Sequence, residues 1–249
     1  ELSRDTIHVS QVISHTLFNS QQKISILSLN KKFLNEIKID IAYVSDTLVV
    51  TSNIAKKNHA LAAINGGFFD MEKGGSVSYF EKNDTVISRT HSSEQKWGKP
   101  NNLINGALII TKGNDLLIDI AKREENVYEK SNEEAFVLVT GPLLIRDSKL
   151  EKLNDKMSFF TKRHPRSCVC STKDSILLIA IDGRNKNAAG MSLFELQKYL
   201  LSLGCIDAIN LDGGGSTTLW TKKLGIVNQP SDRSGERPVS NAIILIRNK

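Results

Sequence analysis

The sequence is poor in cysteine, proline and aromatic residues: its 249 residues include 3 Cys and 5 Pro, and Phe, Trp and Tyr make up 6%. Three cysteines are too few for a disulfide-built scaffold. No apolar run approaches the roughly 18 residues of a membrane-spanning helix, and no Gly-X-Y repeat of a collagen is present. Apolar residues nevertheless make up 40% of the chain, too much for a disordered protein. The composition therefore predicts a soluble globular protein.

The three cysteines leave their own chemical state open. Cys168 and Cys170 lie in an apolar stretch, and Cys205 is far along the chain. One bridge to Cys205 would leave one thiol over, and no Cys-x-x-Cys pair or His stands at the spacing of a zinc site. We favour the interpretation that all three are small buried apolar residues, and we expect no metal and no cofactor.

A basic block is also missing, although 33 Lys and Arg exceed 27 Asp and Glu and the net charge is +6. The basic residues occur singly or in pairs such as Lys31-Lys32, with acidic residues between them. A nucleic-acid groove would show basic residues clustered with aromatics, so nucleic acid is not an expected partner. A Lys-rich surface and an anionic small substrate both fit this charge.

The first half of the chain contains a series of short strand patterns. Apolar alternation or short apolar runs predict strands at 24–29, 37–41, 48–50, 60–64, 77–80 and 135–139, and a hairpin of 103–111 with 116–120. Residues 54–59 are weakly helical, and the charged stretch 122–134 fits a helix or a loop. No repeat or linker divides the chain, so we expect a single domain over residues 1–249.

The second half predicts a strand–helix–strand unit. The continuous apolar run 175–181 is typical of a strand buried on both faces. Ser192 and Glu195 form a capping-box pattern ahead of an apolar helical stripe that ends before Gly204, and 206–211 is a second strand. We expect an α/β (mixed α+β) fold, in which a central mixed sheet carries this C-terminal unit beside many short N-terminal strands.

Two carboxylates follow the two strands of this unit. A strand–helix–strand crossover makes its strands parallel and near neighbours. Asp182 and Asp212 should therefore emerge at one edge of the sheet, roughly 5 to 10 Å apart for adjacent or next-but-one strands. Arg184 lies at the same edge, and such edges are where open α/β sheets bind ligands.

Asp212 opens a run of three glycines followed by Ser216. Consecutive glycines reach backbone conformations closed to other residues, and an array of free N–H groups can cradle a phosphate or another anion. No Gly-Lys-Ser/Thr follows, so this is not a Walker loop. A tight packing loop is the structural alternative, and we favour the functional one.

Other polar residues at strand ends are candidates for the same site. Arg166, before an apolar strand, could clamp a phosphate or carboxylate in a bidentate manner, although a lone arginine is more often structural. Asn65-Gly66-Gly67 ends another strand in a way that allows close approach of a ligand. No histidine pair has metal-ligand spacing, and no Gly-x-Ser-x-Gly nucleophile elbow is present.

These motifs, taken in order, resemble the phosphodiester glycosidase family, which includes the animal enzyme that uncovers mannose 6-phosphate. The matching segments are Asn65-Gly66-Gly67-Phe68-Phe69, His164-Pro165-Arg166-Ser167, Asp182-Gly183-Arg184, Met191-Ser192-Leu193, the run from Asn210 to Thr217, and Arg237-Pro238-Val239-Ser240-Asn241. They order the chain from about residue 60 to its end. Residues 1–55 carry no family signature, and Ser167-Cys168-Val169-Cys170 replaces the Thr-Ala-Val-Gly that is common in relatives.

The resemblance implies a hydrolase that cleaves a sugar from a phosphodiester-linked glycan, with no cofactor. The residues that it places in the substrate-binding part of the pocket are Asn65, Gly66, Gly67, Arg166, Asn210, Gly213, Gly214, Gly215, Ser216, Thr217 and Arg237. Asp212 is our first choice as nucleophile or base, Asp182 is the second, and Arg184 assists them. A glycosyl phosphate already has a good leaving group, so the site needs anion recognition and a carboxylate more than a strong general acid.

Two alternatives stay open. A non-catalytic protein that binds phosphorylated glycans would keep the pocket, but it would gain nothing from two nearby acids. A metal-dependent phosphoesterase would release phosphate or a sugar phosphate instead of free sugar. Because the chain begins with Glu1, we expect that a leader was removed and that the protein is extracytoplasmic, with an upstream lipid anchor as an option.

Overall fold

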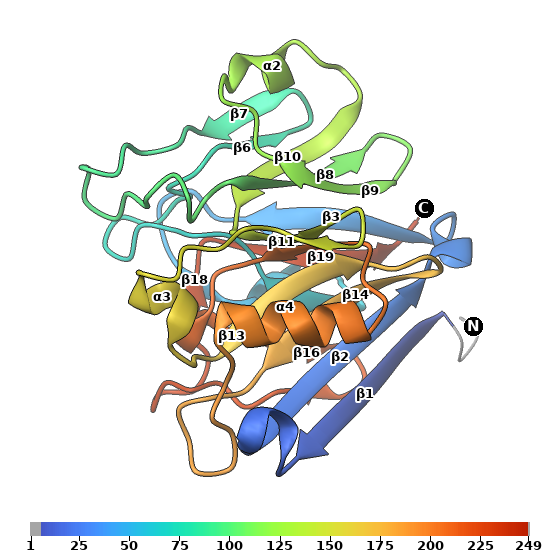
Figure 1. Ribbon diagram of the computed structural model, residues 1–249. Coiled ribbons are helices and arrows are strands. Elements are labelled where there is room, and N and C mark those ends of the chain that lie inside the picture. Colours follow the sequence, from blue (N-terminus) through green and yellow to red (C-terminus); the bar gives the residue numbers. More distant parts are fainter. Residues whose placement is uncertain (1–5, 249) are drawn as a thin grey trace.

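The computed structural model describes residues 6–248, and strands make up most of its secondary structure (Figure 1). The central sheet has seven strands in the order β1-β2-β14-β13-β15-β11-β12. Their bounds are β1 (Ile7–Ser14), β2 (Gln22–Asn30), β14 (Ser175–Ile181), β13 (Arg166–Ser171), β15 (Asp207–Asn210), β11 (Leu143–Arg146) and β12 (Lys149–Leu150). Every neighbouring pair in this sheet is antiparallel.

A second, five-stranded sheet packs against the central one. Its order is β17-β16-β5-β19-β3, with β17 (Gly225–Ile226), β16 (Leu219–Thr221), β5 (Ala62–Asn65), β19 (Asn241–Arg247) and β3 (Ile37–Tyr43). Leu178 of β14, Ile64 of β5 and Ile243 of β19 belong to one apolar cluster between the two sheets. The main core is therefore a layer between two sheets, in which the inward side chains alternate with outward ones.

Helices cover the outer faces of these two sheets. Leu193, Leu196 and Leu200 of α4 (Leu193–Ser202) pack with side chains of the central sheet, in front of which the helix lies in Figure 1. Ile54 and Ala55 of α1 (Thr51–Lys57) pack on the second sheet. The order of layers is thus helix, sheet, sheet, helix.

A third sheet forms the upper part of the molecule in Figure 1. Its order is β7-β6-β10-β8-β9, with β7 (Thr85–Ser88), β6 (Phe80–Lys82), β10 (Glu134–Thr140), β8 (Gly106–Thr111) and β9 (Leu116–Ile120). One face contributes Phe136 and Leu138 to the central core, and the other packs on Tyr128 of α2 (Asn126–Glu129). The remaining elements are a pair of β4 (Val49–Val50) with β18 (Pro238–Val239), the helix α3 (Ser158–Thr161), and short 3₁₀ turns at Leu17–Asn19, Lys31–Phe33 and Gly214–Ser216.

The predicted mixed α+β class and the C-terminal strand–helix–strand unit are confirmed, with one difference in the central sheet. β14 and β15 run parallel, but β13 lies between them and pairs antiparallel with both. The capping box of α4 is present: the Glu195 N–H donates to Ser192 Oγ (3.2 Å), and the Ser192 N–H donates to Glu195 Oε2 (2.9 Å). The predicted hairpin of 103–111 and 116–120 is formed by β8 and β9.

The interpretation of the cysteines as unbridged apolar residues is wrong for two of them. Cys170 and Cys205 form a disulfide with Cα atoms 5.8 Å apart, while Cys168 is a free buried thiol. The end of β13 lies beside the segment that follows α4, where the Ile206 N–H donates to Ser171 O (2.7 Å). This pairing of distant segments brings the two sulfurs together.

Residues without a family signature are part of the same sheets. β1 and β2 extend the central sheet beyond β14, and β3 forms an edge of the second sheet. The core cluster between the sheets contains residues from Leu27 to Leu245. We therefore propose that the chain is one domain and that its N-terminal strands are part of the scaffold that holds the site.

Candidate functional site

Asp212 lies where the exits of β15 and β5 meet. Its N–H donates to Gly66 O (3.0 Å), and its carbonyl oxygen accepts a hydrogen bond from Asn65 Nδ2 (2.6 Å). The residue as a whole is partly exposed. Two glycine-bearing segments that are far apart in the sequence are thereby joined at the backbone of one aspartate.

Asn65 holds this junction together. Its side chain is fully buried, and its Oδ1 accepts hydrogen bonds from Ser167 Oγ (2.7 Å) and from the Thr218 N–H (3.1 Å). With Nδ2 on Asp212 O, its amide connects β5, β13, β15 and β16. We therefore infer that Asn65 positions the backbone of Asp212 instead of contacting a ligand.

The neighbouring glycines allow unusually close packing. A Cβ on Gly66 would collide with Asn241, whose Oδ1 accepts the Gly67 N–H (2.9 Å). A Cβ on Gly213 would lie 2.7 Å from Pro165 O. A side chain at either position would push the strand exits apart.

Gly214 and Gly215 are needed because arginine side chains lie on them. Gly214 has φ +61°, and a Cβ there would lie 3.0 Å from Arg184 Nη2. A Cβ on Gly215 would collide with Arg237 and Asp232, which form an ion pair with Arg237 Nε 2.8 Å from Asp232 Oδ2. The glycine run thus brings backbone into direct contact with two guanidinium groups.

The predicted array of free N–H groups is only partly present. The Gly214 N–H donates to Pro165 O (2.9 Å), the Ser216 N–H to Gly213 O (3.2 Å) and the Thr217 N–H to Gly214 O (3.3 Å). The run closes into a 3₁₀ turn, so these three donors are engaged within the chain, while the Gly215 N–H is not one of them.

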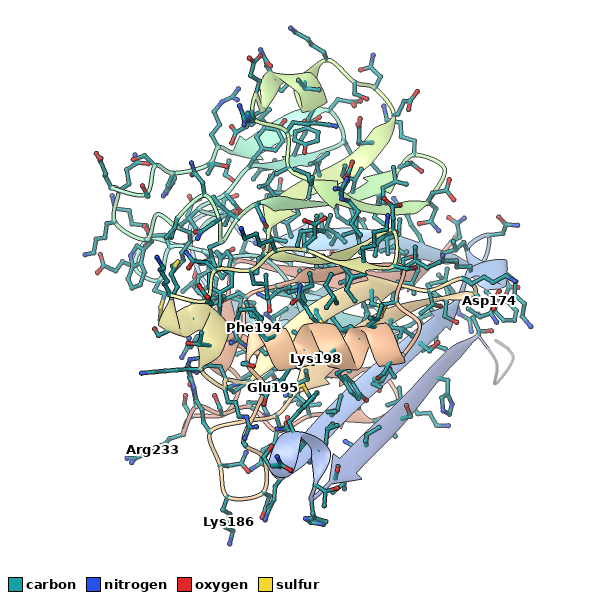
Figure 2. All side chains as sticks on the ribbon, viewed as in Figure 1. Asp174, Lys186, Phe194, Glu195, Lys198 and Arg233 are labelled. Carbon is teal, nitrogen blue, oxygen red and sulfur yellow. A yellow bond between two sulfur atoms is a disulfide. The ribbon has the colours of Figure 1, made fainter. Side chains whose placement is uncertain are left out.

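Arg184 is the exposed cation nearest to the glycine run. Its backbone is left-handed, with φ 60°, and it forms no ion pair with any of residues 6–248. Its Nη2 lies 3.4 Å from His164 Nδ1. Figure 2 shows two further cations, Lys186 and Arg233, projecting outward from the loops that contain Arg184 and precede Arg237.

Arg166, by contrast, is buried and engaged by the chain. It donates to the carbonyl oxygens of Met191 (2.9 Å), Phe159 (2.8 Å) and Lys162 (3.0 Å). Burial, together with the charge of Arg184, lowers the pKa of Arg166 to about 9. The contacts with Phe159 and Lys162 hold the segment before β13 in place. They also keep a second positive charge close enough to Arg184 to affect the pKa of Arg166.

The pKa of His164 is lowered by burial and in part by the positive charges of Arg166 and Arg184. A bound anion would relieve this mutual repulsion. The surroundings of Arg184 are therefore suited to an anionic group of a ligand.

The two predicted acids differ in environment. Asp182 is 1% exposed, and its Oδ1 accepts hydrogen bonds from the Gln229 N–H (2.8 Å) and Asn228 Nδ2 (3.3 Å). Lys23 Nζ lies 3.6 Å from Oδ2. Burial raises the pKa of Asp182, and these partners oppose the rise. Asn228 also donates to Thr217 O (3.1 Å), so Asp182 supports the end of the glycine run from behind.

The charges of two residues from other parts of the chain act on Asp212. Burial raises its pKa, and the nearby Ser216 hydroxyl and the charges of Lys99 and Arg237 oppose this rise. Lys99, whose Nζ is 5.5 Å from the centre of the Phe68 ring, belongs to a polar loop without any motif. The sequence therefore contains no signal by which Lys99 could have been recognised.

Three further residues predicted for the site, Asn210, Ser216 and Thr217, are buried next to the glycine run. Asn210 is fully buried, and its Nδ2 donates to Gly141 O (2.8 Å) and Leu211 O (2.6 Å). The buried Ser216 and Thr217 hydroxyls have no hydrogen-bond partner among the described residues. Within residues 6–248, no three His, Cys, Asp or Glu side chains are grouped as a metal ion would require.

This fold and this arrangement of motifs define a glycosidase class: residues 58–246 match the family described as phosphodiester glycosidase, and the chain belongs to that family. Among the curated relatives, the chain is 25% identical over 192 residues to N-acetylglucosamine-1-phosphodiester alpha-N-acetylglucosaminidase of Bos taurus, a match that covers 72% of the chain and 34% of the relative. It is 24% identical over 169 residues to the SPbeta prophage-derived uncharacterized protein YomE of Bacillus subtilis, covering 66% of the chain and 25% of that protein. The chain thus spans about a quarter to a third of the length of these relatives.

The fold is also found in solved structures. The catalytic domain of the zebrafish N-acetylglucosamine-1-phosphodiester alpha-N-acetylglucosaminidase superposes with a TM-score of 0.78 at 18% identity, over 98% of this chain and 84% of that one. A hypothetical protein from Synechocystis gives a TM-score of 0.69 at 16% identity, over 98% of this chain and 62% of the other. At these identities the superpositions establish the shared fold.

Proposed function

We propose that the protein is a hydrolase that cleaves a sugar from a phosphodiester-linked glycan at the site around Asp212. One observation carries the proposal: Asp212 stands at the start of a glycine run on which the Arg184 and Arg237 side chains pack, and the charges of Lys99 and Arg237 act on its carboxylate. A phosphodiester supplies the anion for the cations, and the anomeric carbon beside it supplies the centre for the carboxylate. Family membership supports the same reaction class.

In the proposed reaction, the bond between the anomeric carbon and the phosphate oxygen breaks. Arg184 holds the phosphate, which leaves as a phosphomonoester, and the oxygen of a water molecule is finally bonded to the sugar. Asp212 either attacks the anomeric carbon or takes a proton from that water. Burial makes its carboxylate a stronger base than an exposed aspartate, while the nearby cations keep the ionised form accessible.

The other predicted residues act on the geometry of the site in this proposal. Asp182 supports the glycine run through Asn228, and Arg166 fixes the segment that contains His164. Asp182 is kept as second choice for the acid or base role. Arg237, Ser216 and Thr217 remain proposed contacts for the sugar or phosphate.

The test is release of free sugar from a methyl phosphodiester of N-acetylglucosamine 1-phosphate, the sugar in the names of the relatives. The wild-type protein should release it, Asp212→Asn should not, and Asp155→Asn, which changes an exposed aspartate elsewhere, should behave as the wild type. Binding without release in the wild type would favour a non-catalytic phosphoglycan-binding protein. Release of sugar phosphate that stops with a chelator would favour a metal-dependent phosphoesterase.

We also propose an extracytoplasmic location. The Cys170–Cys205 disulfide is typical of proteins that fold in an oxidising compartment, and substrates of this kind occur there. No helix within residues 6–248 is long and apolar enough to cross a membrane. Retention of the disulfide in protein isolated from its native compartment, checked by thiol labelling, tests this proposal.

A further inference from the structure

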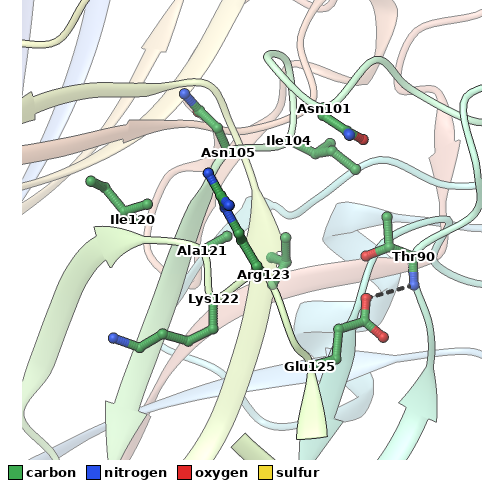
Figure 3. Close-up of a pocket in the computed structure, with 10 residues that line it drawn as sticks. Thr90, Asn101, Ile104, Asn105, Ile120, Ala121, Lys122, Arg123 and Glu125 are labelled. Atoms are coloured by element: carbon green, nitrogen blue, oxygen red, sulfur yellow. Dashed lines mark hydrogen bonds between the residues drawn. The ribbon is translucent and has the colours of Figure 1, made fainter. Parts of the chain in front are cut away.

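A cavity of about 620 Å³ lies beside the third sheet, between the end of β9 and the loop around residues 90–105 (Figure 3). Ile104 and Val139 are buried residues that form its apolar floor. Its volume is within the range of roughly 300 to 1,000 Å³ that is typical of sites for small organic ligands. The cavity is separate from Asp212 and from the glycine run.

The rim of this cavity has an excess of positive charge. Lys122 and Arg123 are exposed, and neither forms an ion pair with any residue between 6 and 248. The acid on the rim, Glu125, is already engaged: its Oε1 accepts the Thr90 N–H (3.1 Å), and its Oε2 is 3.7 Å from Arg89 Nη1. Two cations are therefore left for an outside anion, of which Arg123 extends toward Asn105 in Figure 3.

Amide groups complete the rim. Asn105 uses its Oδ1 to accept the Leu143 N–H (2.9 Å), and its Nδ2 has no hydrogen bond to the described part of the chain. Asn101 lies on the same rim with its side-chain amide exposed. Unengaged amide groups beside an apolar floor are suited to the hydroxyl groups and the ring face of a sugar.

The cavity and the candidate active site share a segment of chain. Lys99, whose charge acts on Asp212, is two residues before Asn101, and two residues span at most about 7 Å. On the other side, Gly141 O accepts Asn210 Nδ2, and the Asn105 side chain holds the nearby Leu143 N–H. The loop with Lys99 and Asn101 and the segment from Gly141 to Leu143 therefore connect the surroundings of Asp212 with the rim of the cavity.

We propose that this cavity binds a further, negatively charged unit of the same glycan, so that the substrate is an oligomer or polymer with repeated sugar phosphodiesters. Lys122 and Arg123 hold the phosphate of that unit, and the Asn101 and Asn105 amides contact its sugar. That this unit belongs to the glycan cleaved at Asp212 rests on the proposed function, whereas binding of the charged unit does not. The site adds affinity and chain-length preference without taking part in bond cleavage.

The test uses two probes: the methyl phosphodiester of N-acetylglucosamine 1-phosphate, and a trimer of that sugar phosphate joined by phosphodiesters. Affinities are measured by calorimetry and KM by sugar release, in the wild type, in Lys122→Ala/Arg123→Ala and in Lys222→Ala/Lys223→Ala. The last variant loses the same charge from the exposed turn after β16. Two lost charge-assisted contacts should weaken trimer binding by roughly tenfold or more and leave the single-unit probe unaffected, whereas the control variant should match the wild type for both probes.

The outcomes separate the two proposals. Weaker trimer binding in the cavity variant alone supports the site even if no protein releases sugar, a result that would overturn the proposed function instead. Sugar release with the same trimer KM in all three proteins overturns the cavity site and leaves the proposed function standing. An equal loss of trimer affinity in both double variants overturns the site as well, since it would show attraction by overall charge.

Discussion

The exits of β14 and β15 are alike in sequence and differ in what packs on them. Each places an aspartate before a glycine, Asp182-Gly183 and Asp212-Gly213, and a Cβ on either glycine would meet the backbone of Pro165, at 2.8 and 2.7 Å. At the first exit, Asn228 and the Gln229 N–H occupy the carboxylate. At the second, the charges of Lys99 and Arg237 act on the carboxylate, and the aspartate as a whole is partly exposed. The same dipeptide is thus hydrogen-bonded within the protein at one exit, and we propose that at the other exit its aspartate carries out the chemistry.

The largest expected effect is the loss of activity in Asp212→Asn. Removing a nucleophile or base should lower kcat by roughly 10³-fold or more. The free energy of unfolding should change by less than about 1 kcal/mol, since the backbone contacts of Asp212 with Asn65 and Gly66 remain. Sugar release and urea unfolding measure the two quantities, and retained turnover would contradict the assignment.

Asp182→Ala should lower the stability of the protein more than Asp212→Asn does. The substitution leaves the Gln229 N–H and Asn228 Nδ2 without their acceptor and Lys23 without its partner, which should cost about 3 kcal/mol of stability. Asp182→Asn keeps an acceptor oxygen and should cost about 1 kcal/mol. Urea unfolding compares the two, and stability equal to the wild type in both would show that Asp182 is not the structural member of the pair.

Arg184 and Arg166 can be compared in the same way, as a proposed phosphate ligand and a residue that stabilises the fold. Arg184→Ala removes an exposed side chain without an ion pair among the described residues, so KM should rise roughly tenfold with unchanged stability. Arg166→Ala leaves the buried carbonyl oxygen of Met191 and the partly buried ones of Phe159 and Lys162 without this donor, and it should lower stability by about 2 to 4 kcal/mol. Similar KM and stability in both variants would remove the distinction.

The smallest effect concerns pH. Burial raises the pKa of Asp212, so the acid limb of its activity should lie above the ordinary range of an aspartate, and ionised Asp212 is lost as the pH falls through that limb. Lys99→Ala removes a charge that lowers this pKa, so the limb should move to higher pH. Lys96→Ala, three residues away and paired with Glu72, is the matched control. A limb that stays in place in Lys99→Ala would separate Lys99 from the site.

The raised pKa of Asp182 should also make the free energy of unfolding depend on pH. Its pKa is raised on folding, so the native state binds this proton more tightly than the unfolded chain. The contribution of the group is fully present below the unfolded pKa, and it declines as the pH rises through the folded pKa. Asp182→Asn should remove that decline when urea unfolding is followed from pH 3 upward, and an unchanged pH dependence would contradict the buried carboxyl.

Local patterns predicted the elements whose residues decide their own structure. The run Ser175–Ile181 is β14 to the residue, and Ser192 with Glu195 starts α4. The strand expected at 77–80 fails at its start, because the Tyr79 N–H donates to Thr90 Oγ1 and regular pairing begins at Phe80. β1 was missed because its mixed polar sequence becomes a strand only by pairing with β2.

What the sequence by itself determined is the pair of strand exits with their acids, the glycine run, and the family to which this order of motifs belongs. These follow from short-range patterns, since apolar period, capping residues and glycine act within a few positions. Only the tertiary structure decided that β13 separates the two strands, that Arg166 is buried while Arg184 is exposed, and that the charge of Lys99 acts on Asp212. Burial and charge at a carboxylate depend on segments far away in the chain, which no local pattern encodes.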